Sequence, residues 1–139
     1  MGRTLRDVMS PNPVTLHTGT TVLEAARKMR DDDIGDVIVL RDGEVGGIVT
    51  DRDIVVRVLA EGLDPQTVSV SQVMSEGVVC LEPNDTVERA TEVMKDHAIR
   101  RVPVVEGGKP VGIVSIGDLA IEANGERALA DISAAPANN

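Results

Sequence analysis

The stretch Gly47-Ile48-Val49-Thr50-Asp51-Arg52-Asp53 decides the fold, because it occurs a second time as Gly112-Ile113-Val114-Ser115-Ile116-Gly117-Asp118. A shift of 65 residues relates the two stretches, and the same shift places Val8-Met9-Ser10 on Val73-Met74-Ser75. Of the 54 positions in residues 4–57, 18 are identical to their partners, and the alignment needs no gap. A self-match at one constant spacing indicates a duplicated structural unit.

Each copy has the same predicted order of elements: a short helical start, an amphipathic helix, two strands and a second helix. In the first copy Val22, Ala25 and Met29 recur at helical spacing behind Thr21. Glu24 lies three residues after that threonine, which is the pattern of a capping box. The sequence therefore predicts a helix that begins after Thr21 and packs its apolar face on a core.

The two strands of each copy are predicted from β-branched runs on either side of a short turn. Residues 37–40 and 45–50 are separated by Arg41-Asp42-Gly43-Glu44, and the second copy repeats this pattern around Gly107-Gly108. A short connection that contains glycine between two such runs is typical of a β-hairpin.

These elements predict an α/β (α+β) fold in which each repeat has a short sheet packed by helices, with a pseudo-two-fold axis relating the repeats. The expected boundaries are residues 4–60 for the first repeat, 61–68 for a linker, 69–124 for the second repeat and 125–139 for a C-terminal helix or tail. A repeat of about 55 residues is marginal as an independent fold, so we expect the copies to bury each other as one module.

The composition argues against nucleic acid as a partner. The chain has no Phe, Tyr or Trp, and its net charge is −9. Single-stranded nucleic acids are usually bound by aromatic side chains along a positive groove, and duplexes are bound by basic residues. Small anions remain acceptable ligands where basic residues gather locally.

The sequence shows no feature of a secreted or membrane protein. Cys80 is the single cysteine, and the N-terminus lacks the apolar stretch of a signal peptide. No apolar run approaches the length that spans a membrane. We expect a soluble cytoplasmic protein with no membrane partner.

Two strand-to-helix corners could bind the sugar and phosphate of a nucleotide. Thr50 with Asp53 and Ser115 with Asp118 each follow a predicted strand and open a predicted helix. A hydroxyl can donate to phosphate, and a carboxylate can accept from both ribose hydroxyls. The same pairs also resemble capping boxes, which would give them a purely structural role.

The paired Val-Met-Ser starts, the Ile-Arg-Arg-Val-Pro-Val-Val strand at residues 99–105 and the two Gly-Ile-Val-Thr/Ser-x-x-Asp corners resemble tandem cystathionine-β-synthase-type (CBS) domains. The stand-alone bacterial type is the most similar, and residues 50–55 and 61–65 resemble the hypoxic-response proteins. The resemblance implies a regulatory module that binds AMP, ADP, ATP or S-adenosylmethionine between its repeats, and no cofactor is required. It also implies a homodimer, and it assigns Thr50, Asp53, Ser115 and Asp118 to ribose and phosphate contacts.

The repeats differ in charge beside these corners. Arg100-Arg101 in the second repeat corresponds to Gly35-Asp36 in the first. In related CBS pairs the equivalents of Arg100 and Arg101 often reach phosphates, and a guanidinium suits that task. We therefore expect a phosphorylated ligand to prefer the second corner. The alternative is that both arginines are surface charges or dimer contacts on a strand edge.

The resemblance also implies a pocket for the base. Because the chain has no aromatic residue, aliphatic side chains and backbone groups would hold it. The predicted lining is Val14, Thr15, Ile34, Val79, Cys80 and Ile99. Each of these residues could equally belong to the core.

Catalysis is not expected, because the sequence shows no nucleophile beside a base and no metal constellation. Cys80 and His97 supply only two of the four ligands of a tetrahedral zinc site, so a metal-responsive protein would need a dimer that shares ligands. A ligand-free interaction dimer is the other alternative. In the ligand-binding interpretation we expect an unidentified effector protein to read the signal, because the sequence predicts no output domain.

Overall fold

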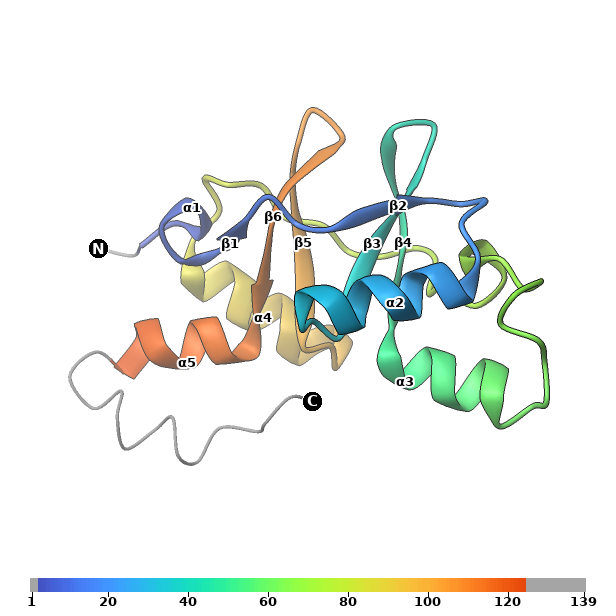
Figure 1. Cartoon of the computed structure of the whole chain (residues 1–139). Helices are drawn as coiled ribbons and strands as arrows, with labels where there is room; N and C mark the ends of the chain where they lie inside the picture. The colour runs from blue at the N-terminus through green and yellow to red at the C-terminus, as the bar shows by residue number, and fades with distance from the viewer. Residues whose placement is uncertain (1–2, 125–139) are drawn as a thin grey trace. The chain divides into compact units, whose positions relative to one another are not determined.

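The computed structural model describes residues 3–124 (Figure 1). The predicted C-terminal helix or tail at residues 125–139 lies outside the described residues. The described residues divide into two compact units, one of residues 14–78 and one that joins the N-terminal segment up to Pro13 to the segment that begins at Val79. The units are divided differently from the sequence repeats, because each unit takes its opening segment from the other copy. Each unit is mixed α/β, as predicted.

The 14–78 unit is built on a three-stranded sheet in the order β2-β3-β4. Strand β2 runs parallel to β3, and β3 and β4 form an antiparallel hairpin. The elements of this unit are β2 (Thr15–His17), α2 (Val22–Asp32), β3 (Asp36–Arg41), β4 (Glu44–Thr50), α3 (Asp51–Ile54), the π-helix η1 (Val55–Leu59) and the 3-10 helix η2 (Val70–Gln72).

The other unit is built on an antiparallel sheet in the order β1-β6-β5. Its first strand comes from the N-terminal segment, and its hairpin comes from the second repeat (Figure 1). The elements are α1 (Leu5–Val8), β1 (Ser10–Pro11), α4 (Val87–His97), β5 (Arg101–Glu106), β6 (Lys109–Ser115) and α5 (Ile116–Asn124).

The capped amphipathic helix predicted behind Thr21 is confirmed as α2. The Thr21 hydroxyl oxygen accepts from the Glu24 N–H at 3.1 Å, and the Glu24 carboxylate accepts from the Thr21 N–H at 3.2 Å. Val22 and Ala25 are fully buried on the core-facing side of the helix. Helix α4 begins with the same kind of N-cap, since the Thr86 hydroxyl oxygen accepts from the Arg89 N–H at 3.0 Å.

Both predicted hairpins are confirmed, and each closes through a two-residue turn. Asp42 and Gly43 have φ values of 56° and 83°, and Gly107 and Gly108 have values of 62° and 83°. Two successive positive φ angles are typical of a type I′ turn, whose twist matches that of the flanking strands.

Each unit has its own aliphatic core. In the 14–78 unit helix α2 and the hairpin bury Val22, Val39 and Val49 together with Val70. In the other unit α4, α5 and the second hairpin bury Ala90, Val104 and Leu119 together with Leu5. Val70 and Leu5 belong to the exchanged opening segments, so burial of apolar surface favours the exchange.

The glycines of the repeated Gly-Ile-Val motif allow the exchanged segments to approach the sheets. A Cβ on Gly47 would lie 2.6 Å from the Ser75 carbonyl oxygen, and a Cβ on Gly112 would lie 3.0 Å from that of Ser10. Ser75 and Ile48 exchange backbone hydrogen bonds of 2.9 and 3.2 Å. The backbone can come this close only because glycine has no side chain.

Candidate functional site

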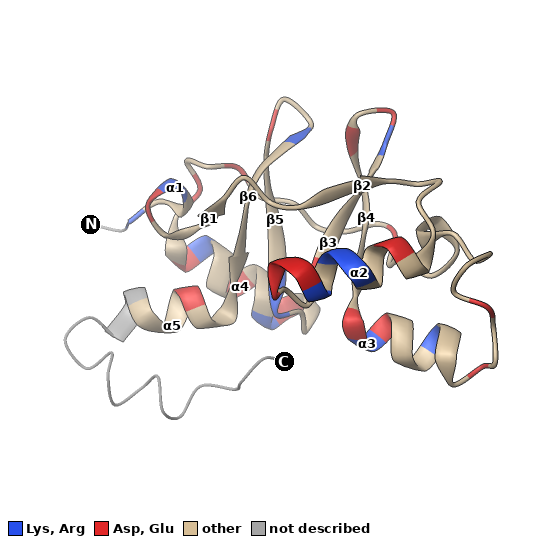
Figure 2. Cartoon of the chain, viewed as in Figure 1, with Lys and Arg blue, Asp and Glu red and all other residues tan. Residues whose placement is uncertain are grey.

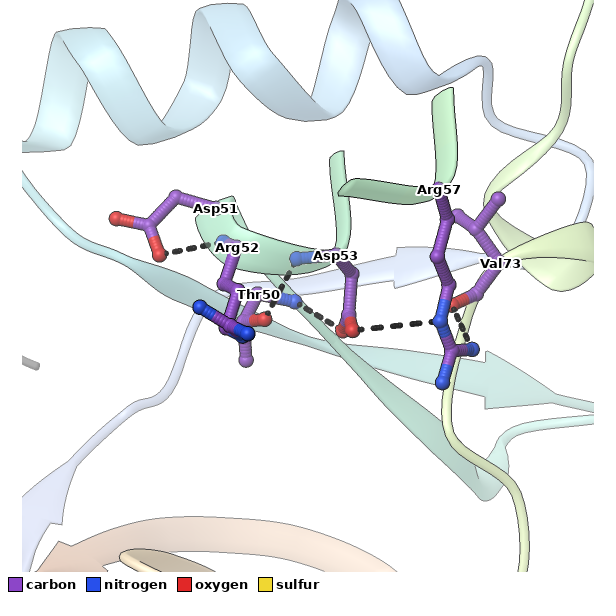
Figure 3. A network of polar contacts seen from close by, with 6 residues as sticks. All are labelled: Thr50, Asp51, Arg52, Asp53, Arg57 and Val73. Carbon is purple, nitrogen blue, oxygen red and sulfur yellow. Dashed lines mark hydrogen bonds and ion pairs between the residues drawn. The ribbon is translucent and has the colours of Figure 1, made fainter. Parts of the chain in front are cut away.

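The first corner is the junction of β4 and α3 in the 14–78 unit (Figure 3). The Asp53 Oδ2 accepts from the Thr50 N–H at 2.9 Å, and the Thr50 Oγ1 accepts from the Asp53 N–H at 3.1 Å. The two side chains thus form a reciprocal capping box. The Asp53 side chain is only 16% exposed.

The second corner, between β6 and α5, has the same geometry. The Asp118 Oδ2 accepts from the Ser115 N–H at 2.9 Å, and the Ser115 Oγ accepts from the Asp118 N–H at 3.2 Å. Both residues are partly buried. The structural role that the sequence left open is therefore present in both copies.

The capping boxes leave one function of each side chain available. A hydroxyl that accepts one hydrogen bond retains its own hydrogen for donation, and a carboxylate offers a second oxygen. Because the caps restrain the rotamers of both side chains, a ligand would meet groups that are already oriented. The arrangement can supply a donor for phosphate and an acceptor for ribose hydroxyls.

The residues beside the corners carry opposite charge. Arg101 pairs with Ser115 across the β5–β6 ladder, and the Arg100 carbonyl accepts from the Ile116 N–H at 2.9 Å. The predicted arginines therefore lie next to the second corner along the backbone. At the same positions the first corner has Asp36 and Gly35. Asp36 is paired with Thr50 in the β3–β4 ladder, and the Gly35 carbonyl accepts from the Asp51 N–H at 2.9 Å.

Acidic residues also dominate the start of α3. Asp51 and Asp53 both lie in its first turn, whereas α5 has only Asp118 there (Figure 2). Arg52 lies between the two aspartates, so α3 has two acidic side chains and one basic one, and its net negative charge disfavours an anion at the first corner.

Arg57 belongs to the first corner and was missed by the sequence analysis. Its Nε lies 3.8 Å from the Asp53 Oδ1, and its Nη1 donates to the Val73 carbonyl at 3.1 Å (Figure 3). The spacing of four residues between Asp53 and Arg57 on one helix could have indicated the ion pair. Nothing in the sequence indicated Val73, which is 16 residues further along the chain.

The predicted base-pocket residues lie near the cores without being fully buried. Val14 and Ile34 pack against the core of the 14–78 unit, and Val79 and Ile99 pack against that of the other unit. Thr15 lies in β2 and is partly exposed. Cys80 is half-buried, and burial raises the pKa of its thiol.

Ile99 contributes to an apolar cavity of about 410 Å³ between α4 and α5. Met94, Leu119 and Ile116 also line it, and Ile116 directly follows Ser115. One predicted base-pocket residue and one predicted phosphate corner are thus neighbours within the same unit.

Within residues 3–124 the structure supplies no further ligands for a zinc site at Cys80 and His97. In residues 3–124 no group of three or more His, Cys, Asp or Glu side chains could hold a metal ion. His97 lies exposed in the last turn of α4.

Over residues 3–124 no helix combines the length and apolarity that a membrane span requires.

Comparisons with known proteins agree with the duplication. The family model described as "CBS domain" matches residues 5–60 and 70–124. The chain is 41% identical over 117 residues to the CBS domain-containing protein YhcV of Bacillus subtilis (strain 168), covering 84% of this chain and 83% of that protein.

Two solved structures have the same fold. Hypoxic Response Protein I, solved with two coordinated zinc ions, aligns with a TM-score of 0.77 and 35% identity, over 85% of this chain and 97% of that one. The CBS domain pair of MJ0100, solved with 5′-methylthioadenosine and S-adenosyl-L-methionine, aligns with a TM-score of 0.80 and 25% identity, over 91% and 99% of the two chains. This chain belongs to the CBS-domain family and carries two copies of the domain.

Proposed function

We propose that this CBS pair is a regulatory module that binds an adenosyl ligand through its two strand-to-helix corners. The observation that carries the proposal is the matched corner geometry. In both units a hydroxyl and a carboxylate are held by reciprocal bonds of 2.9 to 3.2 Å, and each hydroxyl keeps its hydrogen for a ligand. The second carboxylate oxygen can accept from a ligand as well, and in the first corner this oxygen also lies 3.8 Å from the Arg57 Nε. The MJ0100 pair, which was solved with adenosyl ligands, supports the choice of ligand class.

The second corner is the proposed phosphate side. Arg100 and Arg101 lie beside Ser115 and Ile116, whereas the first corner has acidic neighbours. AMP, ADP and ATP should therefore prefer the second corner, while an uncharged nucleoside should discriminate less. Val14, Thr15, Ile34, Val79, Cys80 and Ile99 remain the proposed lining for the base.

Zinc is not carried over from Hypoxic Response Protein I. That protein was solved with two zinc ions, but the described part of this chain brings no three metal-binding side chains together. The proposed protein is cytoplasmic and regulates by binding a small molecule, without catalysis. An effector protein would recognise its ligand-bound state. A ligand can transmit a signal only if it binds one conformation better than another.

A homodimer is the proposed assembly. On η1 the side chains of Val55, Val56 and Leu59 are 54%, 44% and 56% exposed, and on α5 Ile116 and Ile121 are 41% and 49% exposed. Exposed aliphatic faces of helices are disfavoured in water and favour burial against a second copy.

In sedimentation velocity the native chain should exceed the 14.7 kDa of one chain. Val56→Asp should shift it toward the monomer, and Thr67→Asp should not. A native chain that sediments as a monomer would refute the dimer.

Calorimetric titration of Asp118→Ala with adenosine and AMP tests the ligand site. Hydrogen bonds to charged groups contribute about 1.5–3 kcal/mol, so affinity at the second corner should fall about 10- to 100-fold. Because the substitution also removes a cap, the unfolding free energy is measured in parallel. A loss of stability with unchanged affinity for both compounds would leave only the capping role.

Arg100→Ala tests the phosphate preference. AMP binding should weaken about tenfold, since a charge-assisted hydrogen bond is lost, while adenosine binding should stay within about twofold. Arg52→Ala removes the same charge at the first corner and serves as the control. An equal loss for AMP and adenosine would exclude a phosphate role for Arg100.

A further inference from the structure

Arg57 joins the first corner to a distant segment of the same unit. Its guanidinium lies 3.8 Å from the Asp53 Oδ1 and donates to the Val73 carbonyl at 3.1 Å. The other carboxylate oxygen of Asp53 accepts from the Thr50 N–H. One polar network therefore runs from the end of β4, through the Asp53 carboxylate, to segment 69–78 (Figure 3).

Segment 69–78 is attached to the unit on both sides of Val73. The Val70 N–H donates to the Thr20 carbonyl at 2.8 Å, and the Ser75 N–H donates to the Ile48 carbonyl at 2.9 Å. Ile48 precedes Thr50 by two residues on β4. The segment thus contacts both strand β4, which ends at the first corner, and Arg57, which pairs with Asp53 in that corner.

The duplicated fold does not require Arg57. The other positions of the network have counterparts of the same kind in the other copy: Ser115 for Thr50, Asp118 for Asp53 and Val8 for Val73. The counterpart of Arg57 in the sequence is Glu122, an acidic residue that cannot form an ion pair with a carboxylate. A residue needed only to fold the repeat should occur in both copies, so Arg57 gives the first corner a property that the second lacks.

Arg57 is also poorly placed to stabilise the whole chain. Its side chain is 52% exposed, and exposed pairs four residues apart contribute little to global stability. It lies in η1, a π-helix, and such segments are frequent at functional sites. A local effect on the corner and on segment 69–78 fits this position better than a general structural role.

We propose that Arg57 is a positioning residue that couples adenosyl-ligand binding at the first corner to segment 69–78; this rests on the function proposed above. A ribose that binds Asp53 immobilises its carboxylate, which in turn holds the guanidinium against the Val73 carbonyl. By reciprocity, a segment held by Arg57 favours the ligand-ready carboxylate.

The test uses the full ¹⁵N-labelled chain with Asp118→Ala, so that adenosine reports mainly on the first corner. Amide exchange and chemical shifts are followed by NMR with and without saturating adenosine. In the Arg57→Ala variant the Ser75 amide should exchange its hydrogen about fivefold faster without ligand. The variant should bind adenosine about fivefold more weakly, and adenosine should no longer protect that amide from exchange. Arg57→Lys, which keeps one donor, should restore part of the protection.

Arg52→Ala removes the same charge from α3, the helix directly before η1, but leaves the bridge to Val73 in place, so it should behave like the parent. Equal protection of Ser75 by adenosine in Arg57→Ala and in the parent, or tighter binding by the variant, would overturn the proposed coupling. If adenosine shifts no amide in any variant, including the chain with Asp118 intact, the proposed function fails and ligand coupling fails with it. The ligand-free exchange rates then still decide whether Arg57 restrains the segment.

Discussion

Gly47→Ala tests the close approach between strand β4 and the opening segment of the second repeat. The new methyl group would lie 2.6 Å from the Ser75 carbonyl oxygen and 2.7 Å from the Met74 sulfur. The methionine side chain can move, but the carbonyl is fixed because Ser75 and Ile48 bond each other in both directions. Relief therefore requires the two backbone strands to separate.

The expected cost follows from the groups involved. Loss of two backbone hydrogen bonds costs about 1 kcal/mol each, and overpacking adds about 1–3 kcal/mol. The φ of Gly47 is not positive, so alanine can adopt the backbone and recovers about 0.4–1 kcal/mol through the unfolded state. The free energy of unfolding should thus fall by about 3 kcal/mol relative to the native chain.

Urea unfolding followed by far-UV circular dichroism measures this change, because the chain has no Trp for fluorescence. Gly19→Ala is the matched control in the same unit. Its methyl group would meet only His17 atoms at 3.4 and 3.5 Å, which is ordinary contact, and the expected change is within about 0.5 kcal/mol. If Gly47→Ala also stays within about 0.5 kcal/mol, the exchanged segment does not pack as described.

Three further tests concern the helix cap, the hairpin turn and the buried cysteine. Thr21→Ala removes the acceptor for the Glu24 N–H and should cost about 1 kcal/mol in urea unfolding; no loss would mean that the cap contributes nothing. Gly43→Ala places a side chain at φ 83° in the hairpin turn and should cost about 1–2 kcal/mol, whereas Gly117→Ala, which meets only the Ser115 Oγ at 3.6 Å, should be neutral within about 0.5 kcal/mol. Burial raises the pKa of the Cys80 thiol, so at pH 8 less thiolate forms in the folded chain, and iodoacetamide should alkylate it more slowly than the same chain in urea; equal rates would contradict the burial. The sign of the linked effect is that the unfolded thiol loses its proton first, so stability should decrease as the pH rises through the ordinary thiol pKa.

The local elements were predictable because each rests on neighbouring residues. The helix behind Thr21 and the hairpin around Gly43 formed as expected, since capping and turn chemistry act over two to four residues. The two corners were found for the same reason, and the capping box that competes with a ligand role was visible in the same residues. The ion pair of Asp53 and Arg57, which was not predicted, also follows from local spacing.

Other features depend on contacts between residues far apart in the sequence. The segment around Val73 was assigned by sequence to the second repeat, and its hydrogen bond with Arg57 in the other copy could not be read from any pattern. The cavity beside Ile99 likewise arises where α4 and α5 meet. Such contacts depend on how elements pack, which periodicity does not report.

The sequence by itself determined the duplication, the order of the amphipathic helix, the hairpin and the following helix in each copy, and the two hydroxyl–carboxylate corners, because these depend on local spacing and residue type. The short strands β1 and β2 were not predicted. Only the tertiary structure decided which Val-Met-Ser segment packs against which Gly-Ile-Val strand. Both segments carry the same three residues and both strands offer the same glycine, so the local pattern fits either pairing equally well. The choice is made by the burial of Leu5 and Val70 in the core of the opposite copy, where they remove apolar surface from water.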